Sequence, residues 1–226
     1  LLTERWPQAV SSLARTAEHL GEAQGLLDEL AQIDLHAADQ PSPFPWLPLP
    51  SLSLAPLREL SDARQRNVMR HWLTPLTRLP DSDHWASWYS LRDAKRDAQP
   101  LWRLADGELH RCAERIWWVP AAWSDFSDAS VSWPQPQNPL ELLGNGRLEF
   151  VGKPPEGPLE IRYRQGGEIV EVPGRGRRDL KRLLNEGGLP GFMRGRLPLL
   201  YQGGQLLAVP TLAGLWPDST GDWQLH

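Results

Sequence analysis

The sequence predicts an α+β protein with a long connecting helix, a mainly helical first domain, and a small α+β C-terminal domain with antiparallel strands and one basic helix. Two observations predict this architecture. Apolar residues recur every three or four positions up to about residue 92, and from Leu101 onward they alternate with polar residues. A segment rich in Ser, Asp and Pro, residues 124–139, reads as a linker between domains at 1–123 and 140–226.

The first element expected is one long helix from Thr3 to about Leu35. Its apolar residues are spaced by three, four and seven, which places them on one face; they are Trp6, Val10, Leu13, Ala17, Leu20, Leu27, Leu30 and Ala31. Such a helix is about 45 Å long at the standard rise per residue. Because the chain begins with Leu1 rather than Met, we expect a fragment in which this helix connects to an upstream domain.

The next elements of the first domain are predicted from prolines and a helix cap. Residues 41–56 carry six prolines and are expected to form no regular helix. Ser61 is a suitable N-cap, and Asp62 in the first turn suits the helix dipole. The helix that follows has its apolar residues on one stripe, and we expect three arginines to lie off it and to be exposed: Arg64, Arg66 and Arg70. A further helix is expected to begin at Asp81 or Ser82.

From Leu101 the predicted elements are strands. Residues 101–112 read as two strands around an Asp106–Gly107 turn, and residues 114–120 as a third. Beyond the linker, residues 146–152, 159–165 and 168–174 are expected to be strands, and residues 197–210 a hairpin around Gly203 and Gly204.

Composition excludes several classes of protein. There is no apolar run of 18 residues and no signal-peptide pattern, so no membrane segment is expected. The single Cys112 excludes an internal disulfide framework, favours a cytoplasmic location, and is interpreted as structural rather than nucleophilic. The six histidines lack metal-ligand spacing, and no nucleotide-binding or catalytic motif is present. We therefore expect no catalytic residue, no metal site and no cofactor in this chain.

The most unusual feature is the basic segment from Gly174 to Arg196, which holds seven Arg and Lys against two acids. This segment carries +5 within a chain of net charge −4, so the other 203 residues carry −9. A helix over residues 178–186 would turn Leu180, Leu183 and Leu184 to one side and Arg178, Lys181 and Arg182 to the other. The positive charge is therefore local and predicts one defined phosphate-contacting patch.

Glycines and further arginines extend this patch. Gly174 and Gly176 would leave backbone amides open near the helix start, and with the flanking Arg175 and Arg177 they predict a phosphate or carboxylate site. Arg194 and Arg196 are expected to fold back to the same side. The alternative is an ordinary solvated helix face. We favour the binding interpretation over the solvated face for three reasons: these bases lack acids paired at i,i+4, glycines stand at the helix entrance, and arginines continue beyond the helix.

Three stretches, taken in order, resemble a known family. They are LSDARQRNVMRHWL, LHRCAERIWWVP and GRGRRDLKRLLNEGGLPGFMRGRLPLLYQGGQLLAVPTLAGLW. Together they resemble the part of the bacterial tRNA(Ile)-lysidine synthetase family that follows its catalytic domain. The resemblance implies an enzyme that uses ATP to activate C2 of the wobble cytidine in CAU-anticodon tRNA(Ile) and joins lysine to it. The family's SGGxDS nucleotide loop is absent here, so ATP, magnesium and lysine would be bound upstream of this chain.

The resemblance also implies roles for the basic residues. The later domains of this family select tRNA, and the last one contacts the acceptor stem. That role falls on Arg175, Arg178, Lys181, Arg182, Arg194 and Arg196, and more weakly on Arg64, Arg66 and Arg70. The expected partner is tRNA(Ile) with a CAU anticodon, and a homodimer is left open. The alternative is a noncatalytic module that binds phosphate or an acidic protein partner, whereas an ATP-pyrophosphatase of tRNA sulfur chemistry would need further cysteines.

Overall fold

The computed structural model describes residues 5–81, 84–95, 98, 100–150, 153–172, 174–210 and 221–224. The helices are α2 (Ala9–Ala38), α3 (Leu54–Arg58), α4 (Asp62–Leu73), α5 (Trp85–Asp93) and α6 (Leu180–Glu186), with short 3-10 turns η2 (Ala121–Ser124) and η3 (Gly191–Met193). The strands of the first half are β1 (Ser51–Ser53), β2 (Leu101–Arg103), β3 (Gly107–Cys112) and β4 (Arg115–Pro120). The later strands are β5 (Val131–Trp133), β6 (Leu140–Glu141), β7 (Arg147–Phe150), β8 (Leu159–Arg162), β9 (Ile169–Val172), β10 (Gly176–Asp179), β11 (Leu199–Gln202), β12 (Gln205–Ala208) and β13 (Gly221–Gln224). The predicted α+β class is confirmed.

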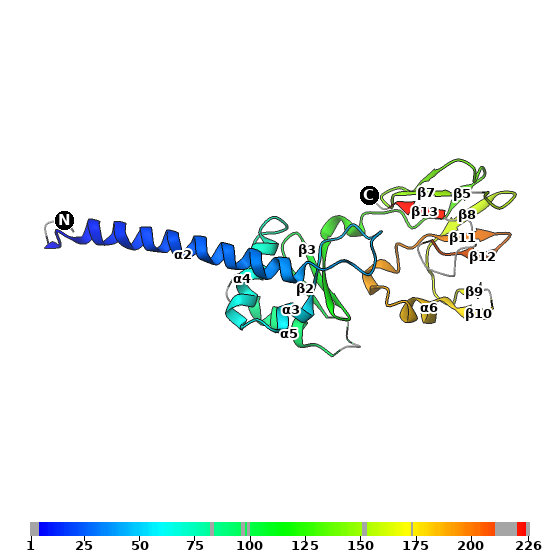
Figure 1. Ribbon diagram of the computed structural model, residues 1–226. Coiled ribbons are helices and arrows are strands. Elements are labelled where there is room, and N and C mark those ends of the chain that lie inside the picture. Colours follow the sequence, from blue (N-terminus) through cyan, green and yellow to red (C-terminus); the bar gives the residue numbers. More distant parts are fainter. Residues whose placement is uncertain are drawn as a thin grey trace.

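Helix α2 projects away from the rest of the molecule, and only its C-terminal part is packed (Figure 1). Its buried residues are Ala31, Asp34 and Ala38, close to α3 and α4. Its apolar stripe is exposed along the projecting part, where 70% of Leu13 and 65% of Leu20 are accessible. Within the described residues, α2 is not long and apolar enough to cross a bilayer, and neither is any other helix.

The rest of the first half is built from helices on an antiparallel sheet of order β1-β4-β3-β2. Ser61 caps α4 by accepting a hydrogen bond from the N–H of Arg64, as predicted. The next helix is predicted to begin at Asp81 or Ser82; Asp81 is not helical, Ser82 lies outside the described residues, and α5 begins at Trp85. Apolar side chains of α3, α4, α5 and the sheet form one buried cluster beneath α2.

The proline-rich stretch contains more regular structure than predicted. Its last part forms β1, which pairs with β4, and the short helix α3. Pro56 is the third residue of α3, where a helix has no intrahelical partner for the backbone N–H, so a proline is tolerated. The expectation that residues 41–56 form no regular helix is wrong for this last turn.

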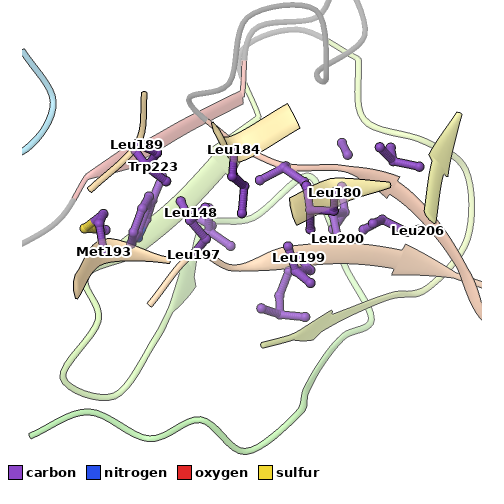
Figure 2. Close-up of a cluster of buried hydrophobic side chains, with 14 of the residues drawn as sticks. Leu148, Leu180, Leu184, Leu189, Met193, Leu197, Leu199, Leu200, Leu206 and Trp223 are labelled. Atoms are coloured by element: carbon purple, nitrogen blue, oxygen red, sulfur yellow. The ribbon is translucent and has the colours of Figure 1, made fainter. Parts of the chain in front are cut away.

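The C-terminal half has three small antiparallel sheets, of order β12-β11-β8-β5, β10-β9 and β13-β7-β6. Strand β5 lies inside the predicted linker 124–139: it pairs with β8, and its Trp133 is buried. This stretch is therefore partly an edge strand of the C-terminal sheet. Figure 2 shows Leu180 of α6 beside Leu200 of β11 and Leu184 above Leu148 of β7, within one buried cluster.

The two halves are joined by a shared apolar interface. Trp117 and Val119 of β4 belong to the same buried cluster as Trp223 and the leucines of α6. Before β1, Leu47 is buried in this cluster, and the ring of Trp46 packs on Trp223 with centroids 5.7 Å apart. The C-terminal half is therefore packed against β4 as well as connected to it.

Candidate nucleic-acid interface

The basic helix exists, and it starts two residues later than predicted. Helix α6 begins at Leu180, and the carboxylate of Asp179 caps it by accepting a hydrogen bond from the N–H of Arg182 at 2.9 Å. Leu180 and Leu184 are buried, whereas Lys181 and Arg182 are exposed. The predicted division into an apolar and a cationic side therefore holds for these four residues.

Arg178 belongs to β10 rather than to the helix. In the β9–β10 ribbon it lies opposite Val170, and its neighbour Arg177 lies opposite Glu171. Because successive side chains of a strand point to opposite faces, the two arginines are on opposite faces of the ribbon. Every residue of β10 is exposed, so both guanidinium groups are accessible.

Three cations of this region have no acidic partner among the residues that the structure describes. They are Arg177, Arg178 and Lys181, and all three are exposed. We call them the free cations. A cation without an internal partner can bind an external anion without first breaking an ion pair. The free cations are therefore the residues of the basic segment best suited to bind phosphate.

Arg175 and Arg182 converge on Glu186 instead. Arg175 Nη2 lies 3.0 Å from Glu186 Oε2, and Arg182 Nε lies 3.0 Å from Glu186 Oε1. These two guanidinium groups lower the pKa of Glu186. Arg182 and Glu186 are an i,i+4 pair, so the interpretation that the bases of this segment lack such acids is wrong.

Arg196 is buried, so the prediction that it folds back to the cationic side is wrong. Only 4% of it is accessible, and it donates hydrogen bonds to the carbonyls of Trp123 and Gly144 and to Asn145 Oδ1. Its guanidinium also lies over the ring of Trp123, 4.2 Å from the centroid. Arg196 therefore holds the segment after β4 against the C-terminal half, and it is not on the surface.

Arg194 is half-buried and also has an internal role. Its Nε and Nη2 donate to the carbonyl of Leu189 at 3.0 and 2.8 Å, and its Nη1 donates to Asn185 Oδ1 at 2.6 Å. Burial lowers the pKa of Arg194, but an arginine stays charged in either case. It lies beside the C-terminal end of α6 rather than with the free cations.

The expected anion site at the start of the helix is not formed. Gly174 and Gly176 adopt the positive φ values of 70° and 66° and have open space around them, but they form the turn between β9 and β10. Strand β10 separates this turn from α6, and the carboxylate of Asp179 already occupies the helix start. An anion would meet a negative charge there.

The arginines of the first domain are mostly engaged in packing. Arg64 forms an ion pair with the buried Asp34 of α2, at 2.5 Å between Nη2 and Oδ1, and this bond raises the pKa of Arg64. Arg66 donates to the hydroxyl of Tyr89 at 2.5 Å. Both are half-buried, so the prediction that they are exposed is wrong. Of the three candidate arginines, Arg70 is the exposed one, with its guanidinium 5.7 Å from the ring centroid of Trp85.

Cys112 is half-buried, as its structural interpretation requires. Its Sγ–H points to the carbonyl of Gly188 at 3.6 Å, and burial raises the pKa of the thiol. A raised pKa leaves less thiolate at neutral pH, so this sulfur is a poor nucleophile. Within the described part of the chain, no three His, Cys, Asp or Glu side chains gather as metal ligands would.

Sequence reasoning missed two features of this region. Glu186 was not recognised as the partner of Arg175 and Arg182, although its spacing from Arg182 was visible in the sequence. Asn185, which binds Arg194, gave no signal, because that contact depends on how the chain turns at Gly188 after the helix. The free cations, by contrast, were all within the basic segment.

This geometry defines a two-part α+β protein with one local cationic surface on an otherwise acidic body. A family model described as the TilS substrate binding domain matches residues 52–117, and another described as the TilS substrate C-terminal domain matches residues 159–223. The chain therefore belongs to the TilS family, of which it carries these two domains in this order. The family resemblance seen in the sequence is confirmed.

Similar proteins carry the name tRNA(Ile)-lysidine synthase. That of Pseudomonas fluorescens (strain Pf0-1) is 59% identical over 226 residues, covering 100% of this chain and 51% of the relative. That of Pseudomonas aeruginosa is 58% identical over 227 residues, covering 99% and 51%, and that of Salmonella typhimurium (strain LT2) is 32% identical over 221 residues, covering 92% and 49%. The chain thus spans about half the length of these curated relatives.

A solved structure described as the crystal structure of the TILS C-terminal domain is also similar. It is 20% identical, has a TM-score of 0.30, and the match covers 42% of this chain and 88% of that chain.

Proposed function

We propose that this chain is the tRNA-recognition part of a tRNA(Ile)-lysidine synthase. The observation that carries the proposal is the group of free cations, Arg177, Arg178 and Lys181, on the surface of a TilS substrate C-terminal domain. A-form RNA is bound largely through its phosphates and its shape, which three unpaired cations on a protruding ribbon and helix can address. Arg175 and Arg182 would contribute once their pairing with Glu186 is exchanged for phosphate.

The substrate and the reaction are carried over from the relatives. We propose tRNA(Ile) with a CAU anticodon as the partner, held by both the helical first domain and the C-terminal domain. The ligation of lysine to C2 of the wobble cytidine, with ATP and Mg²⁺, would be performed by the half of the relatives that this chain does not span. Since a bacterial tRNA is cytoplasmic, the same proposal places the protein there. A homodimer remains a proposal from the sequence alone.

The first prediction tests the free cations. The double variant Arg178→Glu and Lys181→Glu should weaken binding of an unmodified CAU-anticodon tRNA(Ile) transcript about a hundredfold at low salt, because two phosphate contacts become repulsions. Both side chains are exposed and have no acidic partner among the described residues, so the fold should be unchanged. Filter binding measures the affinity, and circular dichroism checks the fold.

The matched control is Lys153→Glu. Lys153 is also an exposed lysine of the C-terminal half, and its ion pair with Glu156 is highly exposed and contributes little to stability. Comparing it with Lys181→Glu separates a local contact from a general effect of net charge. Equal loss of tRNA affinity in both single variants, or unchanged affinity in the double variant, would reject the assignment of the surface.

A further inference from the structure

A cleft lies between the two halves of the molecule, beside the C-terminal end of α6. Its volume is about 460 Å³, within the range of about 300–1,000 Å³ common for binding pockets. The first half contributes His110, Arg111 and Cys112, and the C-terminal half contributes Asn185, Phe192 and Arg194. The thiol of Cys112, from the first half, contacts the carbonyl of Gly188, from the C-terminal half, at 3.6 Å.

The charged group that this cleft offers to a ligand is the guanidinium of Arg194. None of the described residues that line the cleft is an Asp or Glu, and the other lining arginine, Arg111, is buried with its guanidinium bonded to carbonyls of the first half. The lining histidine, His110, is paired with Glu108, whose carboxylate also accepts a hydrogen bond from Arg103. The cleft thus presents the positive charge of Arg194 in a concave site on a chain of net charge −4.

The cleft also continues the surface of the free cations. Lys181 and Asn185 are one turn apart on α6, so their side chains lie on the same side of the helix. Asn185 in turn contacts Arg194 through the 2.6 Å hydrogen bond to Nη1. A line of donors therefore runs from Lys181 through Asn185 to Arg194. The cleft meets the first domain at His110, whose ring lies 5.1 Å from that of Phe192.

Donors remain available inside the cleft. A guanidinium group has five N–H bonds, and three hydrogen bonds from Arg194 to protein acceptors leave two for a ligand. The amide nitrogen of Asn185 donates to no acceptor among the described residues, while its oxygen is held by Arg194. The half-buried ring of Phe192 forms an apolar wall next to these donors.

We propose that this interdomain cleft takes a sugar–phosphate segment of the tRNA that passes from the C-terminal domain to the first domain. This inference rests on the proposed function, because it extends the same RNA-binding surface. Once one side of the cleft holds the RNA, the contact with the other side is intramolecular. The affinity of the two domains together is therefore higher than that of either domain alone. Asn185 and Arg194 would contact the phosphates, and Phe192 would limit the depth to which the ribose enters.

The test adds one negative charge to each wall. Asn185→Asp keeps the shape and the acceptor oxygen for Arg194, and Ala98→Glu places a carboxylate on the opposite, exposed wall. Each variant should bind the CAU-anticodon tRNA(Ile) transcript about five- to tenfold more weakly at low salt, through repulsion of a nearby phosphate. The matched control is Asn138→Asp, an exposed asparagine that does not line the cleft, and its affinity should stay at the wild-type value.

Cys112 gives an independent readout, since it is the only cysteine of the chain. Bound tRNA should slow the reaction of its thiol with a maleimide, and the protection should be lost in Ala98→Glu. Wild-type affinity in both wall variants together with an unprotected Cys112 would overturn the inference. If those results accompany a loss of binding in the Arg178 and Lys181 double variant, the proposed function stands and only the cleft is wrong; if that variant also binds normally, the proposed function itself fails.

Discussion

At the scale of single residues, the arginines of the basic segment differ in what their guanidinium groups contact. Arg177 and Arg178 face solvent without an acidic partner among the described residues. Arg175 and Arg182 share Glu186, and Arg196 is enclosed by carbonyls and aromatic rings. All five arginines carry the same charge. Their positions in the fold therefore determine which of them can contact a phosphate.

Arg196 leads to a prediction about stability. Replacing it in Arg196→Met would leave the carbonyls of Trp123 and Gly144 and the side chain of Asn145 without their donor in a buried site. Because each unsatisfied buried acceptor costs about 1–3 kcal/mol, the free energy of unfolding should fall by about 3 kcal/mol or more. Urea unfolding measures this, with the exposed Arg182→Met as control, and equal midpoints for the two variants would contradict the role given to Arg196.

At the scale of elements, the turn between β8 and β9 is organised by Glu168. Its carboxylate is largely buried and accepts hydrogen bonds from the N–H groups of Gln165 and Gly166, both at 2.6 Å. Burial acts to raise the pKa of Glu168, but the two backbone donors and Arg164 together hold it below its usual value. The ionised form is therefore the one that the folded turn favours.

This lowered pKa predicts a pH dependence with a definite sign. A carboxyl whose pKa is lower in the folded state stabilises the protein above the unfolded pKa of about 4.3, and this contribution is lost as the pH falls through the folded value. Wild type should therefore be more stable than Glu168→Gln at pH 7, and the difference should shrink below about pH 4. Thermal unfolding at a series of pH values checks this. A difference that stays constant from pH 7 to pH 3 would show that the ionisation of Glu168 contributes nothing.

Elements with a clear period or cap could be predicted from the sequence. Ser61 before α4, the Asp106–Gly107 turn and the apolar side of α6 were all visible in local patterns. Strand β5 was not, because its three residues are defined by pairing with β8, which is distant in sequence. The burial of Arg196 was hidden for the same reason: the groups that surround it come from positions 123–126 and 144–145, and no local rule connects them.

At the scale of the whole molecule, charge separation decides how RNA can bind. The chain has a net charge of −4 at pH 7, so a nucleic acid is repelled on average and attracted where unpaired cations gather, as they do on the basic segment. The free cations are three, and Arg175, Arg182 and Arg194 could add to them if their internal bonds are exchanged. For the C-terminal domain, the number of phosphate contacts in the proposed tRNA complex is therefore bounded at three to six.

This bound predicts the salt dependence of tRNA binding. With about 0.7–0.9 counterions released per contact, three to six contacts give a slope of about −2 to −5 for the logarithm of the association constant against the logarithm of salt concentration. The double variant of Arg178 and Lys181 should reduce the magnitude of the slope by about 2, one for each lost contact. Filter binding of the CAU-anticodon tRNA(Ile) transcript between 50 and 300 mM KCl measures both slopes. A wild-type slope near zero, or equal slopes in the two proteins, would mean that these cations do not contact phosphate.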